Sequence, residues 1–244
     1  MVGHLSNATQ VICMELNKIY NMDCIEGMKE LTDESIDIVI TSPPYEDISG
    51  AGYSAVNKDI LFFKLYSEFM DKMFIELYRV LKEDGQIFFN IKSKTHNSEL
   101  RTPHWVEFID AFKHFKLKSY IIWKYAGSFD SSKKRFHLDY EIIYHLSKSD
   151  DIYLNEECGI KDPLSSVWYV PHNIQDRLHP TQMPEGVVER ILTVCGHPNI
   201  TVLDIFSGSG TTCAVAKKFN YNYIGFEINP EYCKIAENRI GGML

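Results

Sequence analysis

Residues 201–212 read Thr-Val-Leu-Asp-Ile-Phe-Ser-Gly-Ser-Gly-Thr-Thr. The first five favour a buried strand, and Gly208 and Gly210 form a short loop before a helix that begins near Thr211. Because glycine carries no Cβ, such a loop lets the backbone approach a ligand closely, and the helix N-terminus favours an anionic group. The stretch therefore predicts an α/β sheet with a nucleotide-type cofactor site at the end of one strand.

The glycine spacing disfavours a nicotinamide enzyme. The dinucleotide-binding motif requires a third glycine at position 213, where this chain has Cys213. We therefore expect a different nucleotide-type cofactor.

A second motif, Ile40-Thr41-Ser42-Pro43-Pro44-Tyr45, ends the apolar stretch 36–40. Proline fixes φ and removes a backbone donor, so the two prolines alone are compatible with a simple turn that ends a strand. Paired with the glycine loop, the motif instead indicates a rigid catalytic turn with an aromatic tip. Together the two motifs suggest methyl transfer to the amino group of a base.

The length and the apolar runs favour one soluble domain. The chain has 244 residues, enough for a core of alternating strands and helices, and we expect residues 1–244 to form a single domain. The longest apolar runs, such as Ile60–Phe63, are too short to span a bilayer, and no basic segment with an apolar core opens the chain. These features predict a cytoplasmic protein without a membrane partner.

The cysteines and histidines show no metal or disulfide pattern. Six cysteines lack a Cys-x-x-Cys pair and nine histidines lack ligand spacing, which indicates reduced thiols and no bound metal. No cysteine follows a proline, so the covalent Pro-Cys route to carbon-5 methylation of cytosine is excluded.

Positive charge is concentrated in residues 101–148. The whole chain has a formal charge of −8, but this segment has nine Lys and Arg against five acidic residues, so it carries +4 and the remainder −12. Phosphate neutralisation supplies much of the affinity for nucleic acid, although a solvated charged face gives the same bias. With the two motifs, we favour a DNA-facing edge where Lys133, Lys134 and Arg135 contact phosphates or guanine edges.

Apolar periodicity predicts alternating strands and helices. A long amphipathic helix is expected from Asp59 to about Lys82, ended by Asp84-Gly85, with its aromatic stripe in the core. Residues 46–58 are expected to form a lid loop. The expected strands are 18–23, 36–40, 86–91, 118–125, 140–146, 167–170, 201–205 and 223–227, and the other helices 24–31, 104–115, 185–195, 211–219 and 230–239.

The two ends of the chain complete one sheet. The C-terminal strand, glycine loop, helix, strand and helix correspond to the first half of a doubly wound sheet, and the N-terminal strands to its third and fourth positions. We therefore predict a doubly wound, Rossmann-like α/β sheet that is circularly permuted, with the catalytic motif before the cofactor motif and an antiparallel strand at one edge. Both motifs would then share one cleft at the carboxyl ends of neighbouring strands.

In this motif order, residues 18–241 closely resemble the β group of DNA amino-methyltransferases, which use S-adenosylmethionine. The segment His179-Pro180-Thr181-Gln182-Met183-Pro184 resembles the third landmark of that family. Members often carry Lys where Met183 stands, and we expect no contact to depend on this position. The resemblance implies a methyltransferase sheet with S-adenosylmethionine as cofactor.

The resemblance also implies which residues bind the cofactor. Thr211 and Thr181 are expected at the methionine carboxylate. Glu227 is expected at the ribose hydroxyls and Asp23 at the adenine amino group. The full implied set is Asp23, Thr181, Asp204, Phe206, Ser207, Gly208, Gly210, Thr211 and Glu227.

Structural alternatives remain for several of these positions. Asp23 is also suited to cap the following helix, and Glu227 to be a solvated charge at a strand end. Asp204 is also suited to orient the glycine loop without touching the cofactor. For His179 a structural role is preferred to a catalytic one.

The resemblance assigns catalysis to the turn Ser42, Pro43, Pro44 and Tyr45. Ser42 Oγ and the Pro43 carbonyl are expected to accept the hydrogens of an exocyclic amine, which favours the tetrahedral nitrogen that attacks a sulfonium methyl. The prolines fix the direction of these acceptors, and Tyr45 is expected to stack on a base flipped out of the duplex. Orientation then supplies most of the rate without a metal.

The serine of the turn bears on the target base. Ser-Pro-Pro-Tyr is commoner in relatives that methylate cytosine N4 and Asp-Pro-Pro-Tyr in those that methylate adenine N6, so we favour cytosine and keep adenine as the alternative. RNA or protein amino-methyltransferases usually place the glycine loop first. A catalytically dead DNA-binding partner would have damaged motifs, and both motifs are intact here.

The region that would select a target sequence is small. We assign it to residues 126–178, with a contribution from the loop 93–103. So little material implies a short site in double-stranded DNA or help from a second subunit, which makes a homodimer a candidate. The enzyme is expected either to protect host DNA beside a cognate restriction endonuclease or to act alone.

Overall fold

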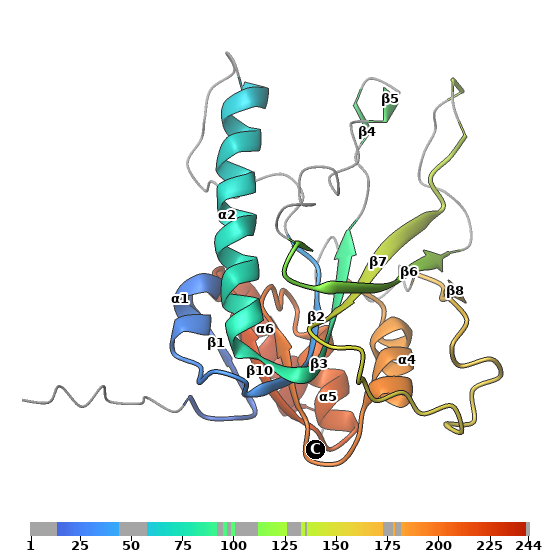
Figure 1. Ribbon diagram of the computed structural model, residues 1–244. Helices are drawn as coiled ribbons and strands as arrows, with labels where there is room; N and C mark the ends of the chain where they lie inside the picture. Colours follow the sequence, from blue (N-terminus) through green and yellow to red (C-terminus); the bar gives the residue numbers. More distant parts are fainter. Residues whose placement is uncertain are drawn as a thin grey trace, which may run out of the picture.

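The computed structural model describes residues 14–43, 58–91, 95–96, 99–100, 112–125, 133–134, 136–172, 178 and 182–242. In this part of the chain an eight-stranded sheet has the order β1-β10-β9-β2-β3-β7-β6-β8 (Figure 1). The strands are β1 (Lys18–Tyr20), β2 (Ile36–Thr41), β3 (Leu81–Ile91), β6 (Lys116–Lys124), β7 (Tyr140–Ser147), β8 (Val167–Tyr169), β9 (Thr201–Asp204) and β10 (Asn222–Phe226), with β4 (Thr95–His96) and β5 (Glu99–Leu100) paired separately. The helices are α1 (Cys24–Lys29), α2 (Lys58–Val80), α4 (Glu185–Cys195), α5 (Thr211–Lys218) and α6 (Pro230–Gly241).

The strand order confirms the predicted permutation. The C-terminal strand β9 pairs in parallel with β2, and β10 pairs in parallel with β1, so the two ends of the chain build one sheet. The N-terminal strands occupy the third and fourth positions relative to β9 and β10, as predicted. The catalytic and cofactor motifs therefore follow neighbouring strands.

The antiparallel strand of the prediction is β7. It runs antiparallel to both β3 and β6, while β8 pairs in parallel with β6 outside it. In this half β3, β6 and β7 have 11, 9 and 8 residues, whereas every pairing among β1, β10, β9 and β2 is parallel.

Helices cover both faces of the sheet, as Figure 1 shows. One core layer contains α4, α5 and α6, represented by Ile191, Val215 and Ala236. The other contains α1 and α2, where Met28 and Phe74 are buried. Side chains of strand β2 pack into both core layers because successive residues point to opposite faces of the sheet, as expected for a central strand of a doubly wound sheet.

Most of the stripe of α2 whose side chains are described lies in the core as predicted, but Phe69 is only partly buried and lines a cavity. Met70, Met73, Phe74 and Leu77 are almost fully buried. Phe74 packs against Phe89 at a ring-centroid distance of 5.2 Å and against two further aromatic rings. Such aromatic contacts stabilise a core beyond the area they bury.

The helix α2 ends earlier than predicted. Leu81 is fully buried and pairs with Ile36, so β3 begins there and not at Gln86. The register then shifts, and pairing resumes with Gln86 opposite Ile38, which leaves Asp84-Gly85 within a bulge of β3. The predicted helix 104–115 and the lid 46–58 lie largely outside the described residues.

Candidate active site

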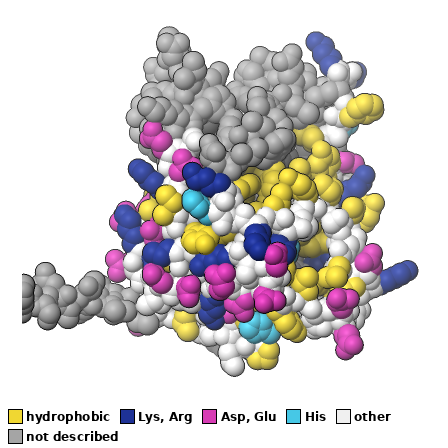
Figure 2. Space-filling view, in the orientation of Figure 1, with side chains coloured by type: hydrophobic (Ala, Val, Ile, Leu, Met, Phe, Trp, Pro, Cys, Tyr) yellow, Lys and Arg dark blue, Asp and Glu magenta, His cyan; other side chains and the backbone are white. Residues whose placement is uncertain are grey.

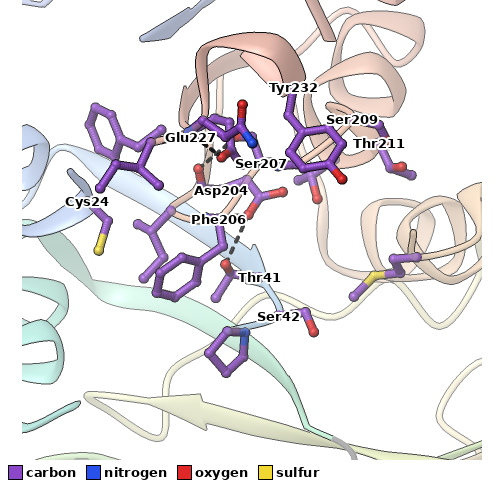
Figure 3. Close-up of a pocket in the computed structure, with 18 of the residues that line it drawn as sticks. Cys24, Thr41, Ser42, Asp204, Phe206, Ser207, Ser209, Thr211, Glu227 and Tyr232 are labelled. Atoms are coloured by element: carbon purple, nitrogen blue, oxygen red, sulfur yellow. Dashed lines mark hydrogen bonds between the residues drawn. The ribbon is translucent and has the colours of Figure 1, made fainter. Parts of the chain in front are cut away.

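A cavity of about 280 Å³ opens at the carboxyl ends of β2 and β9 (Figure 3). This is the position at which open α/β sheets bind ligands, beside the strand where the order reverses. Most of the predicted site residues within the described part of the chain line it. These are Asp23, Ser42, Pro43, Asp204, Phe206, Ser207, Gly208, Thr211 and Glu227.

Four predicted site residues lie outside the described residues, namely Pro44, Tyr45, Thr181 and Arg135. Their roles stay predictions. Gly210 is described but does not line the cavity. It has φ of 75°, and a Cβ added at this position would lie 2.7 Å from Ala236 Cβ, so glycine is needed here for the turn and for packing on α6.

The glycine loop is held by Glu227. Its Oε2 accepts a hydrogen bond of 2.8 Å from Gly208 N, and its Oε1 accepts one of 2.7 Å from Asn229 N. The carboxylate therefore fixes the loop while it also faces the cavity. Each carboxylate oxygen has a second lone pair, which leaves acceptor capacity for a ligand hydroxyl.

Asp204 ties the two motifs together. Its Oδ1 accepts hydrogen bonds from Thr41 Oγ1 at 2.9 Å, drawn in Figure 3, and from Phe206 N at 3.1 Å. Burial raises the pKa of Asp204 to about 6, although its bonds to Thr212, Phe206 and Thr41 oppose that shift. This geometry matches the alternative in which Asp204 orients the glycine loop.

Asp23 caps α1, in agreement with the structural alternative for this residue. Its Oδ1 accepts from Ile25 N at 2.9 Å and from Glu26 N at 3.1 Å. It also lines the cavity beyond the carboxyl end of β1. The cap and a ligand contact are therefore compatible in one side chain, since a carboxylate has several acceptor positions.

Arg239 supports the start of α5 and was not predicted. Its Nη1 donates to Thr211 Oγ1 at 2.9 Å and to Ser209 O at 3.3 Å, and its Nη2 donates to Glu185 at 2.6 Å. The guanidinium thus links α6, α4 and the glycine loop. The sequence carried no signal for it, because the contact depends on how α6 crosses α5.

The third landmark docks on the same loop. Gln182 Oε1 accepts a hydrogen bond of 3.1 Å from Ser209 Oγ. Met183 lines the cavity, and the expectation that no contact depends on this position stays untested. Its neighbour Pro184 sets the N-terminus of α4, which aims the segment at the glycine loop.

Apart from Phe206, the aromatic walls of the cavity were not predicted from the sequence. Phe69 of α2 lies 6.2 Å from Phe206 between ring centroids, and both line the cavity. Tyr232 of α6 and Ile228 line another part of the wall. A stripe of apolar residues on a helix signals burial and does not distinguish a core position from a cavity wall.

The basic segment is partly neutralised by ion pairs. Lys116 and Lys118 both contact Asp150, Lys124 contacts Asp139, and Lys148 lies 3.9 Å from Glu34. Figure 2 shows Lys and Arg interspersed with Asp and Glu on the face it presents. Lys133 and Lys134 are exposed, and their contact with DNA stays a prediction.

Neither a metal cluster nor a membrane span occurs among the described residues. In this part of the chain no cluster of three or more His, Cys, Asp or Glu is arranged to hold a metal ion. Nor does any described helix combine the length and apolarity that a membrane span requires.

The sheet order and the shared cleft define a Rossmann-like methyltransferase with a permuted motif order. A family profile described as DNA methylase, of the N6 and N4 type, matches residues 36–238. The chain belongs to this family and is a DNA amino-methyltransferase.

Curated DNA methyltransferases are similar in sequence to this chain over most of their length. The chain is 31% identical to the type II methyltransferase M.BglII of Bacillus subtilis, covering 93% of this chain and 69% of that protein. It is 30% identical to the DNA adenine methyltransferase YhdJ of Escherichia coli K12, covering 93% and 83%.

Solved structures share the fold at lower identity. The cytosine-N4-specific PvuII DNA methyltransferase superposes with a TM-score of 0.78 at 19% identity, covering 91% of this chain and 85% of that one. M1.HpyAVI in complex with S-adenosylmethionine has a TM-score of 0.65 at 23% identity, covering 91% and 98%.

Proposed function

We propose that this protein transfers the methyl group of S-adenosylmethionine to the exocyclic N4 amine of cytosine at a specific site in DNA. The observation that carries the base assignment is Ser42, an uncharged hydroxyl at the cavity in the first position of the catalytic turn. The cytosine-N4-specific PvuII enzyme shares the fold and supports this assignment.

Adenine N6 is the second candidate. It is favoured by the 30% identity to an adenine methyltransferase over most of both chains. Both amines need hydrogen-bond acceptors at the same place, so the turn alone does not separate them.

S-adenosylmethionine is the methyl donor, and the cavity has the groups that it needs. Glu227 offers acceptors for ribose hydroxyls, and Asp23 for the adenine amino group. Phe206 and Phe69 provide an apolar wall suited to an adenine ring. The N-terminus of α5, with Thr211, suits a carboxylate.

The bound cofactor supplies an electrophilic methyl group on a sulfonium. The chain must then hold a poor nucleophile in line with that methyl, because the lone pair of the base amine is delocalised into the ring. Ser42 Oγ and the Pro43 carbonyl accept the two amine hydrogens and draw the nitrogen towards tetrahedral geometry. The bond between Thr41 and Asp204 fixes the distance between this turn and the glycine loop, which keeps both reactants in register.

A base in a duplex cannot enter this cleft, so it is flipped out. Tyr45 stacks on the extruded ring, and Lys133, Lys134 and Arg135 hold phosphates or guanine edges near the target. Residues 126–178 select the site. A homodimer would add to so small a recognition region, and the enzyme acts either beside a cognate nuclease of a type II restriction system or alone.

The base assignment is tested by product analysis. The purified protein is incubated with labelled S-adenosylmethionine and unmethylated genomic DNA, which is then digested to nucleosides and analysed by mass. We expect N4-methylcytosine, with Ser42→Ala and Tyr45→Ala cutting turnover strongly and cofactor affinity little. N6-methyladenine as the product would refute the cytosine assignment, and near-normal methylation by both variants would refute the catalytic turn.

The DNA contacts are tested by salt dependence. Replacing Lys133, Lys134 and Arg135 with Ala should weaken DNA binding and flatten the dependence of log K on log salt by about one unit for each phosphate that the variant no longer neutralises. A slope equal to that of the wild type would remove this loop from the interface.

A further inference from the structure

Strand β7 carries a carboxylate directly beside the catalytic turn. Glu141 Oε2 accepts a hydrogen bond of 2.9 Å from Asn90 Nδ2, and the same nitrogen lies 3.5 Å from Ser42 Oγ. Because one nitrogen makes both contacts, the two oxygens are at most about 6.4 Å apart. Glu141 is therefore a near neighbour of the group that receives the target amine.

Asn90 and Glu141 are both buried. Asn90 is 3% exposed and Glu141 is 7% exposed, so neither is a surface group screened by water. Charge interactions in such a position are stronger than at the surface, since the effective dielectric constant is lower. The aromatic side chain of Tyr125 is also nearby, and its pKa is raised to about 12 by burial and, secondarily, by the charge of Glu141.

The fold places Asn90 and Glu141 close to the turn. Asn90 lies at the carboxyl end of β3, which is the neighbour of β2, and Glu141 lies at the start of the antiparallel β7. The direction of β7 brings its N-terminal residues to the edge of the sheet where the parallel strands end. On the neighbouring strand β6, Trp123 lies opposite Glu141. The next residue, Lys124, forms an ion pair of 3.1 Å with Asp139.

The reaction creates a positive charge at this place. As the target nitrogen forms its bond to the methyl carbon, the electrons of the carbon–sulfur bond move to sulfur, and the nitrogen becomes cationic. It then loses one hydrogen as a proton to water. Ser42 is uncharged and cannot balance the transient charge on the nitrogen.

We propose that Glu141, held by Asn90, supplies the negative charge that the catalytic turn lacks, and so stabilises the amine as it becomes cationic during methyl transfer. Asn90 is a positioning residue that sets the distance between Glu141 and Ser42. The proposal rests on methyl transfer to an exocyclic amine of DNA and holds for either base.

The test removes the charge and keeps the shape. Glu141→Gln retains an oxygen that accepts from Asn90, so the packing is preserved. Glu141 lies within about 6.4 Å of Ser42, and the target nitrogen lies about 3 Å from Ser42. For separations of about 6 to 9 Å between Glu141 and that nitrogen, at an effective dielectric constant of about 20, removing the charge corresponds to a fall in kcat of about 20- to 100-fold. The dissociation constant of S-adenosylmethionine, measured by calorimetry, should stay within about twofold of the wild type, because Glu141 does not line the cavity.

Charge rescue separates this role from a structural one. Adding Ser42→Asp to Glu141→Gln returns a carboxylate to the turn and should raise kcat at least about tenfold above Glu141→Gln alone. Glu141→Asp, which keeps the charge, should exceed Glu141→Gln in kcat. Asp150→Asn is the matched control, because Asp150 follows the other end of β7 and is exposed, and its turnover should equal that of the wild type.

Each outcome decides the proposal. A Glu141→Gln enzyme that binds cofactor and keeps kcat within about threefold of the wild type would overturn it, and so would a low kcat that neither Ser42→Asp nor Glu141→Asp improves. If the wild type methylates adenine, the cytosine assignment fails while the comparison of variants still decides the role of Glu141. If the wild type methylates no DNA base, both proposals are refuted.

Discussion

Replacing Asp204 with Asn should change how stability depends on pH. Asp204 is buried at the junction of β2 and β9, and burial raises its pKa to about 6. In an unfolded chain the pKa of an aspartate is about 3.9. Between these values the folded protein holds a proton that the unfolded chain has released, so this group stabilises the fold at low pH and the stabilisation is lost as pH rises through 6.

The magnitude follows from the two pKa values. Between pH 4.5 and pH 7.5 the contribution of Asp204 to the free energy of unfolding should fall by about 2 kcal/mol. The amide of the Asp204→Asn variant has no such titration, yet its side-chain oxygen is able to accept from Thr41 and Phe206. The quantity to compare is therefore the difference in the free energy of unfolding between the wild type and the variant at each pH, since every other titrating group is common to both proteins.

Denaturant unfolding at four pH values from 4.5 to 7.5 measures this difference. Coincidence of fluorescence and circular dichroism transitions checks that the free energies come from a two-state process. We expect the wild type to lose about 2 kcal/mol more than the variant as pH rises. Parallel profiles, or a larger loss in the variant, would show that Asp204 is not a desolvated carboxylate and would refute the reasoning.

Three further predictions concern the core and the site. Burial lowers the pKa of His145 to about 4. As pH falls from 7 to 4.5, the free energy of unfolding of the wild type should therefore fall by about 2 kcal/mol more than that of His145→Gln. An equal fall in both proteins would contradict this. Gly225→Ala should lower the free energy of unfolding by about 1–3 kcal/mol in denaturant unfolding, because the new Cβ would lie 2.4 Å from Ser207 Oγ. Gly241→Ala is the control, because a Cβ there has no atom within 4 Å and should not destabilise the protein. Equal stabilities of the two variants would exclude the clash. Glu227→Gln should weaken S-adenosylmethionine binding about tenfold in calorimetry. Gly208 N and Asn229 N each donate to a different oxygen of Glu227, so the amide NH₂ of the variant would face one of these donors. Unchanged affinity would remove Glu227 from the cofactor site.

Much of the fold was predictable because local signals agreed with the tertiary structure. Helix α4 begins and ends at the predicted residues, since Pro184 and Gly196 bracket its amphipathic pattern. The order of the two motifs was enough to predict the permuted sheet, because parallel strands place their carboxyl ends at one edge. The end of α2 was not predictable from periodicity, since Leu81 suits a helix and a buried strand equally and only its pairing with Ile36 decides.

The site was predictable where a motif marked it and not where packing made it. Asp204 and Glu227 lie at the ends of the strands that flank the glycine loop, where the resemblance predicted them, and both line the cavity. Arg239 and Glu141 come from α6 and β7, and their approach to the loop and the turn depends on helix crossing and strand direction. No short-range pattern encodes such distances.

The pairing of β2 with β9 has a consequence for synthesis. It joins Ile38 to Val202, so the N-terminal strands leave the ribosome long before their partners exist. Closing so long a loop makes folding slow, and until β9 arrives the edge of β2 is an open, apolar template for other chains. A nascent chain that ends before β9 lacks both the glycine loop and this strand partner. Cofactor therefore cannot assist folding until synthesis is nearly complete, and the β9-facing edge of β2 stays unpaired by its native partner until then.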